Sequence, residues 1–167
     1  MDLSRFQDLD VVLVCGLPGA GKSHFSAKYF KVSDRLRINR KEIRRHLYEM
    51  THFGERWSED RFDSQDEFLV KHVERKILEH LLQQEQKLLI DNTSVSVSSR
   101  KAYLAAARAF KRSAGVIFLD TSREKCIQRN RGREEPIPDT VIVNLSLQIE
   151  IPEKREGFRE VLVVEDY

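Results

Sequence analysis

The chain has 167 residues, of which 40% are hydrophobic and 34% are charged, and its formal net charge is +2. This length suits a single domain over residues 1–167 that buries its own core, and no apolar run is long enough to cross a bilayer. The first ten residues are acidic and polar, unlike a secretory signal, so we expect a cytoplasmic protein without a membrane partner. The oligomeric state stays open.

Short apolar runs alternate with longer amphipathic stretches along the chain, as is typical of β-α units around a parallel sheet. The runs predict strands at 11–15, 36–38, 88–90, 116–119 and 161–164. The stretches between them predict helices near 22–30, 40–50, 64–84, 97–111, 122–129 and 138–149. Right-handed crossovers would place helices on both faces, so the predicted fold is a three-layer α/β/α sandwich with a parallel sheet.

The first strand runs directly into the pattern GxxxxGK[ST], and a helical stretch follows it. Glycines let such a loop curl around a phosphate with its N–H groups pointing inward, and the helix start adds a favourable potential for an anion. Lys22 would then reach the β- and γ-phosphates, and the Ser23 hydroxyl would bind magnesium. The predicted nucleotide contacts are Gly16, Leu17, Pro18, Gly19, Ala20, Gly21, Lys22, Ser23 and His24.

The second strand leads into a helix start with many cations. Asn39 can cap this helix, with Glu42 completing a capping pair. Arg40 and Arg44 lie four residues apart and share one helix face, so both could contact a second, phosphate-bearing substrate. The whole basic stretch comprises Arg35, Arg37, Arg40, Lys41, Arg44 and Arg45.

In the 64–84 helix, spacings of four or five residues predict a buried stripe of Phe68, Val73, Ile77 and Leu81. The third strand ends at Asp91, a position from which a carboxylate can order magnesium through water.

A second basic stretch ends in Arg129-Asn130-Arg131-Gly132-Arg133, which interrupts a helical pattern and precedes two prolines. It predicts a mobile lid at about 129–138, in which Arg129 and Arg131 would contact the nucleotide phosphates. An arginine there can neutralise charge that develops during phosphoryl transfer. A plain surface loop is the alternative.

Together these motifs resemble the polynucleotide 5′-hydroxyl kinase family over nearly the whole chain. The segments that carry the resemblance are GLPGAGKS, INR, LLIDNTSVSVSSR, RNRGR with its trailing prolines, and EGFREVLVV.

The resemblance implies a P-loop kinase fold with a lid, and transfer of the γ-phosphate of ATP, with Mg²⁺, to the 5′-hydroxyl of a nucleic-acid end. By matched positions Lys22 and Ser23 would hold ATP and magnesium, and Arg131 would be the lid arginine. On the acceptor side, Arg44 would meet the acceptor's phosphate, and Asp91 and Asn92 would line its pocket.

One position departs from that family, which usually has an aspartate directly after the NR pair to take the acceptor's proton. Here the residue is Lys41, and a protonated lysine cannot accept a proton. Glu42 or Asp91 could serve as the base, although capping is the simpler role for Glu42. Alternatively, positioning and charge stabilisation suffice with a weak base. In that case Lys41 would be a further substrate contact.

Two other functions stay open at this stage. The acceptor could be a small molecule, a nucleotide or a transfer RNA, or the chain could bind nucleotide without efficient transfer. An open basic groove beside Arg40 and Arg44 would suit a polymer, whereas a closed pocket would suit a small acceptor.

Overall fold

The computed structural model describes all residues 1–167 and contains one sheet of five parallel strands. The strands are β1 (Val11–Gly16), β2 (Leu36–Ile38), β3 (Leu88–Asp91), β4 (Ala114–Asp120) and β5 (Glu160–Glu165). Their order across the sheet is β2, β3, β1, β4, β5, and every neighbouring pair is parallel. The predicted parallel sheet is therefore confirmed.

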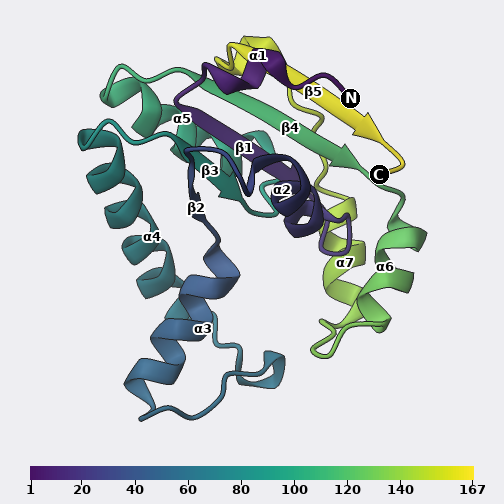
Figure 1. The fold of residues 1–167 in the computed structure, drawn as a ribbon. Helices are drawn as coiled ribbons and strands as arrows, with labels where there is room; N and C mark the ends of the chain where they lie inside the picture. Colours follow the sequence, from purple (N-terminus) through teal and green to yellow (C-terminus); the bar gives the residue numbers. More distant parts are fainter.

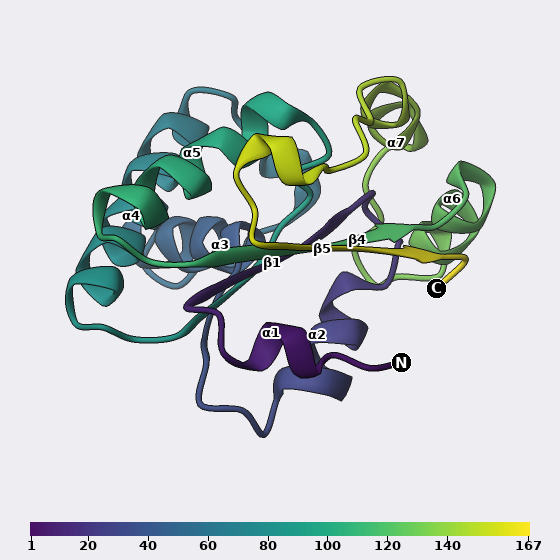
Figure 2. The same cartoon turned by 90° about the horizontal axis from the view of Figure 1, so that it is seen from above.

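Helices cover both faces of this sheet. They are α1 (Ser4–Gln7), α2 (Lys22–Phe30), α3 (Arg40–Thr51), α4 (Asp66–Gln83), α5 (Val97–Ala109), α6 (Arg123–Arg131) and α7 (Asp139–Ser146). Two short 3-10 turns are η1 (Glu59–Arg61) and η2 (Lys154–Glu156). Figure 2 shows α1 and α2 on one face of the sheet and α4 and α5 on the other. In Figure 1, α3, α6 and α7 extend beyond the carboxyl ends of the strands, so this edge carries most of the polar sequence motifs.

The core lies along the two central strands. All six residues of β1 and the first six residues of β4 are buried. Both strands are near-continuous apolar runs because helices cover both faces of a parallel sheet and leave no solvated side. The predicted elements agree with the observed ones to within a few residues at most ends.

Two predictions about helices need correction. Helix α6 continues through Arg131, so the first part of the predicted lid is helical and only residues 132–138 form a loop. Helix α4 buries a different face: Phe68 is 81% exposed, and the buried positions are Val70, Glu74, Leu78 and Leu82.

Polar contacts explain why α4 buries this face. These buried residues recur every fourth position, and the carboxylate among them has partners only on the inner side of the helix. No helix, α4 included, is both long and apolar enough to cross a membrane.

Two buried arginines hold the fold together. Arg35 donates hydrogen bonds to the main-chain oxygens of Phe6, Gln7, Leu9, Asp10 and Leu88. It therefore fastens α1 to the starts of β1 and β3, which makes it a structural residue of the first basic stretch.

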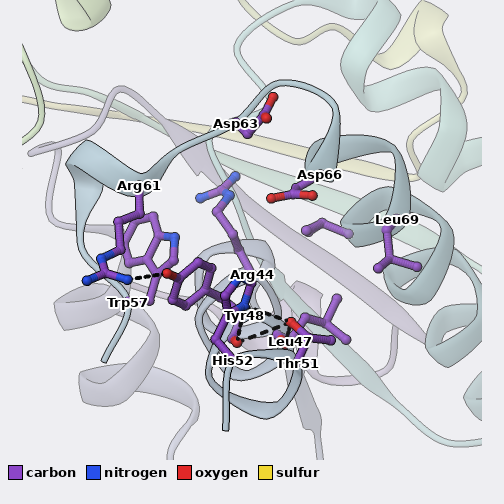
Figure 3. A pocket seen from close by; sticks show the side chains of 11 residues that line it. Arg44, Leu47, Tyr48, Thr51, His52, Trp57, Arg61, Asp63, Asp66 and Leu69 are labelled. Atoms are coloured by element: carbon purple, nitrogen blue, oxygen red, sulfur yellow. Dashed lines mark hydrogen bonds between the residues drawn. The ribbon is translucent and has the colours of Figure 1, made fainter. Parts of the chain in front are cut away.

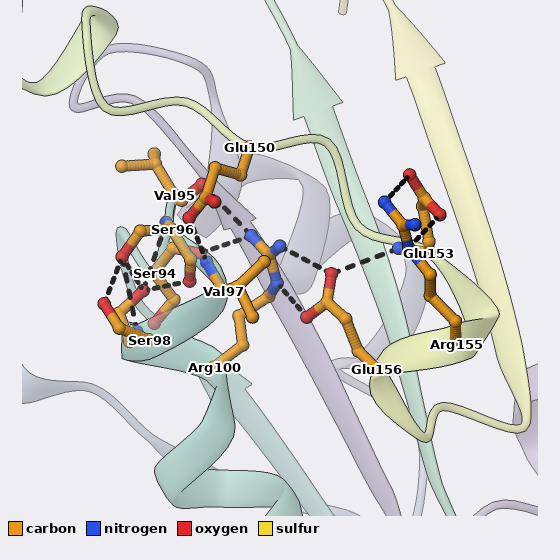
Figure 4. A network of polar contacts seen from close by, with 11 residues as sticks. Ser94, Val95, Ser96, Val97, Ser98, Arg100, Glu150, Glu153, Arg155 and Glu156 are labelled. Atoms are coloured by element: carbon orange, nitrogen blue, oxygen red, sulfur yellow. Dashed lines mark hydrogen bonds and ion pairs between the residues drawn. The ribbon is translucent and has the colours of Figure 1, made fainter.

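Arg100, the arginine of the serine-rich segment, is completely buried (Figure 4). It makes a bidentate ion pair with Glu156, with distances of 2.8 and 2.7 Å, and donates to the main-chain oxygens of Ser94 and Val95. The pair joins the start of α5 to η2, and thereby fixes the segment that leads into β5.

Candidate phosphate and acceptor site

The glycine-rich loop lies between β1 and α2, at the carboxyl end of the sheet. Gly19 has a φ of 90°, and a Cβ placed on it would lie 2.3 Å from the main-chain oxygen of Cys126. The loop is thus in backbone contact with α6, the helix that leads into the predicted lid. Only glycine fits both the backbone angle and the contact.

Lys22 lies folded inside this loop. Its ammonium group donates to the main-chain oxygens of Gly16 at 2.9 Å and Leu17 at 2.8 Å. Burial lowers the pKa of Lys22 to about 8, an effect that the charge of Asp91 opposes and that of Arg133 reinforces. A phosphate bound in the loop would favour the charged form of Lys22 and raise its pKa again.

Asp91, at the end of β3, is fully buried and has only one of its two oxygens occupied. Arg37 donates to Oδ2 through Nε at 3.1 Å and Nη2 at 2.7 Å, whereas Oδ1 is buried without any partner. An orphaned carboxylate oxygen beside the phosphate loop fits a water molecule of a magnesium shell. Ser23, in the first turn of α2, is exposed and can supply its hydroxyl to the same ion.

His24 and Arg129 both contact Tyr167, the last residue of the chain. The Nδ1 atom of His24 lies 2.8 Å from the hydroxyl of Tyr167, and Arg129 donates to the main-chain oxygen of Tyr167 at 2.8 Å. Because the ring of Tyr167 also approaches Gly21, the two predicted nucleotide contacts flank the amino end of α2.

Arg40 and Asn92 belong to a buried polar network. The guanidinium of Arg40 pairs with Glu74 at 2.6 Å and donates to the Tyr103 hydroxyl at 2.9 Å. The amide of Asn92 accepts from the main-chain N–H of Arg40 and donates to both Glu74 and Tyr103. Burial is the main reason that the pKa of Tyr103 is raised, so its hydroxyl stays a proton donor. Both residues therefore fix the start of α3 against β3, α4 and α5.

Arg44 lies on the outer part of α3, over the rings of Trp57 and Phe62. It is hydrogen bonded to Glu67 and lines a cavity of about 50 Å³ with Tyr48 and Trp57 (Figure 3). Lys41, one turn earlier, lies 5.5 Å above the same indole and pairs with Glu59 at 2.8 Å.

The first basic stretch is therefore charge-compensated rather than open. Four of its six cations face carboxylates; these are Arg37, Arg40, Lys41 and Arg44. Glu42, the candidate base, both sits at the capped start of α3 and accepts from Arg37 at 2.7 Å. The predicted cap by Asn39 is confirmed, but Glu42 does not complete the predicted capping pair, because its carboxylate pairs with Arg37 instead. The sequence could not show this pairing, because the partners lie on α4, η1 and β3.

Arg131 and Arg133, which follow Arg129, have different neighbours. Arg131 pairs with Asp139 of α7 at 2.6 Å and is 70% exposed. Arg133 forms no ion pair, and it lies near enough to Lys22 for its charge to lower the pKa of that lysine. Arg133 belongs to a predicted basic stretch, but its place beside Lys22 was not predicted. Arg133 follows the end of α6 in the loop at 132–138, so helical spacing could not have indicated this position.

The family model described as an AAA domain matches residues 11–146. In curated proteins, heterogeneous nuclear ribonucleoprotein U-like protein 2 of Homo sapiens is 22% identical over 161 residues, or 93% of this chain. This chain spans only 21% of the length of that relative.

Among solved structures, a chain of the Pnkp1/Rnl/Hen1 RNA repair complex matches with a TM-score of 0.66 and 19% identity. That match covers 83% of this chain and 43% of the other. A gluconokinase from Sinorhizobium meliloti matches with a TM-score of 0.61 and 15% identity, covering 93% and 81%. The resemblance to polynucleotide kinases is thus confirmed as a P-loop kinase fold, which kinases of small molecules share.

Proposed function

Because the chain belongs to this AAA-domain family of P-loop kinases, we propose that it is an ATP-dependent kinase whose acceptor is the 5′-hydroxyl of a nucleic-acid end. The observation that carries the proposal is the pair of polar groups facing the loop. The side chain of Lys22 folds back into the loop, and Asp91, on the neighbouring strand, has a buried oxygen without a hydrogen-bond partner. This arrangement suits a triphosphate and its metal ion.

When bound, ATP with magnesium supplies an activated γ-phosphoryl group. The loop amides and Lys22 would hold the phosphate chain, and Ser23 and Asp91 are the residues that would hold the magnesium ion with its water. Arg129, Arg131 and Arg133 of the lid are the cations available to neutralise charge during transfer. Of these, Arg131 is paired with Asp139 and Arg129 is hydrogen bonded to the main-chain oxygen of Tyr167, whereas the charge of Arg133 acts on Lys22.

On the acceptor side, the start of α3 is held rigidly beside Asp91 by Asn39, Arg40 and Asn92. Rigid placement of an acceptor contributes to catalysis because phosphoryl transfer depends on positioning and electrostatics. Arg44 remains a candidate contact for a phosphate of the acceptor, which would have to displace Glu67 from it.

The carboxylates that pair with the cations of α3 favour a second candidate function, the phosphorylation of a small hydroxyl compound. A site for a polyanion usually presents unpaired cations, whereas the cations of α3 already have partners. The gluconokinase among the structural neighbours uses the same fold. A cytoplasmic location and the nucleic-acid acceptor are both parts of the proposal.

The test is transfer of label from γ-labelled ATP in the presence of magnesium. The acceptors are 5′-hydroxyl DNA and RNA oligonucleotides, gluconate and shikimate. We expect labelled oligonucleotides with the wild type and none with Lys22→Ala. A matched control is Lys28→Ala, which removes an exposed lysine from the same helix outside the loop.

Three outcomes would redirect the proposal. Labelling of gluconate or shikimate alone would establish the second candidate function. Tight ATP binding without transfer to any acceptor would indicate a nucleotide-dependent binding module. Transfer that survives Lys22→Ala would show that the activity comes from another protein.

A further inference from the structure

Lys41 lies in the first turn of α3, at the position where polynucleotide 5′-hydroxyl kinases usually have an aspartate. In this structure a carboxylate from another segment, that of Glu59, lies beside it. The Oε1 atom of Glu59 lies 2.8 Å from the Lys41 ammonium. Glu59 belongs to η1, in the connection between α3 and α4. Resting on the proposed function, we propose that Glu59 is the general base that takes the proton of the acceptor hydroxyl.

The two carboxylates that the sequence offers for this task are occupied by one arginine. Glu42 accepts from Arg37 at 2.7 Å, and Asp91 accepts from Arg37 through Oδ2. The other oxygen of Asp91 is buried without a partner and is the one proposed above for the metal shell. Glu59 has no arginine partner, so its carboxylate is held by Lys41 alone.

The connection that carries Glu59 is anchored. Trp57, two residues earlier, is 1% exposed, and Lys41 lies over its ring. Only 17% of the Glu59 side chain is exposed. The carboxylate is thus partly shielded from water while it remains reachable.

Glu59 also lies where the lid and the acceptor helix meet. Glu135 of the lid loop lies 3.8 Å from the same Lys41 ammonium. Under the proposed function the nucleotide would lie against the phosphate loop and the lid arginines, which leaves the gap between the lid and the start of α3 as the entrance for the acceptor hydroxyl. Lys41 acts as a positioning residue that aims Glu59 into this gap.

The acceptor oxygen attacks the γ-phosphorus, and its proton passes to a carboxylate oxygen of Glu59. The bond from the γ-phosphorus to the bridging oxygen breaks, and ADP leaves with that electron pair. Glu59 then returns the proton to solvent.

The experiment measures kcat with the acceptor that the wild type phosphorylates fastest. We expect Glu59→Gln to lower kcat by about 100-fold, the lower end of general-base effects, with ATP affinity within about twofold of wild type. Glu79→Gln, which removes a carboxylate paired with Arg75 and Lys76 on α4, serves as control and keeps kcat within about threefold.

Chemical rescue separates a base from a structural ion pair. Formate should restore transfer by Glu59→Ala, whereas chloride at equal ionic strength should not, because only a carboxylate accepts the proton. The Lys41→Glu, Glu59→Lys double variant returns a carboxylate to α3 and should exceed Glu59→Gln by about tenfold.

The inference fails if the wild type transfers phosphate and Glu59→Gln keeps more than about a third of its kcat. It also fails if Glu59→Ala loses activity and formate restores none of it while thermal unfolding and ATP affinity are unchanged. A wild type that transfers phosphate to no acceptor would instead overturn the proposed function itself.

Discussion

Arg37 holds one oxygen of Asp91 through two hydrogen bonds and leaves the other oxygen buried and free. The carboxylate is therefore oriented before any ion arrives. Pre-orientation of this kind lowers the entropic cost of binding a metal ion with its water molecules.

Asp91→Asn should weaken the binding of ATP in the presence of magnesium by roughly tenfold, about 1.4 kcal/mol. The neutral amide orders metal-bound water less well than a carboxylate. ATP affinity measured by calorimetry without magnesium should change little. An equal loss with and without the ion would show that Asp91 acts on the loop rather than on the metal.

The lowered pKa of Lys22 predicts that the protein takes up a proton when it binds the nucleotide. With a pKa of about 8 in the free protein, about half of Lys22 is neutral at pH 8, and the bound phosphates raise that pKa. Calorimetry at pH 8 in buffers of different ionisation enthalpy should show up to about half a proton taken up per ATP. Affinity should fall as the pH rises through this value, because the neutral lysine must first be protonated.

The proton uptake should vanish in Lys22→Met and persist in Lys28→Met. A wild type that binds ATP without proton exchange at pH 8 would contradict the lowered pKa.

Gly19→Ala should damage the phosphate loop more than an alanine at a glycine with the same backbone angle. Gly54 has a φ of 87° but nothing within 4 Å of its would-be Cβ, whereas Gly19 meets the Cys126 oxygen at 2.3 Å. Both substitutions cost about 1–2 kcal/mol of backbone strain, and only Gly19→Ala adds a backbone clash. Thermal unfolding and ATP binding should both separate the two variants, and equal effects would refute the contact.

Arg100→Met should lower the free energy of unfolding by about 3–5 kcal/mol, since it leaves the buried Glu156 carboxylate without its partner. Urea unfolding of the intact chain measures this. Arg75→Met, which removes an exposed arginine paired with Glu79, should leave the midpoint nearly unchanged. A small effect of Arg100→Met would mean that the fold around η2 tolerates a buried charge.

The lid arginines offer a matched comparison under the proposed function. Arg133→Ala should reduce kcat at least about tenfold more than Arg131→Ala, because Arg131 is paired with Asp139 and Arg133 is not. Single-turnover transfer measures the difference. A larger loss for Arg131→Ala would restore the role that the sequence gave it and imply that its ion pair opens during the reaction.

The strands, their parallel arrangement and the phosphate loop were all predictable from the amino-acid sequence. These depend on local patterns, namely apolar runs such as Val11–Cys15 and a glycine-rich turn between a strand and a helix. The cap of α3 by Asn39 was predictable for the same reason, because donor and acceptor are three residues apart.

Which carboxylates pair with the cations of α3 could be known only from the folded structure. A run of cations predicts a basic surface, but its carboxylate partners Glu59, Glu67 and Glu74 come from segments that reach α3 only after the chain has folded. The buried face of α4 was settled likewise, since burying Glu74 is favourable only when Arg40, Asn92 and Tyr103 surround it. Electrostatic pairing between distant segments leaves no local periodicity, and so the sequence carries no pattern from which it can be read.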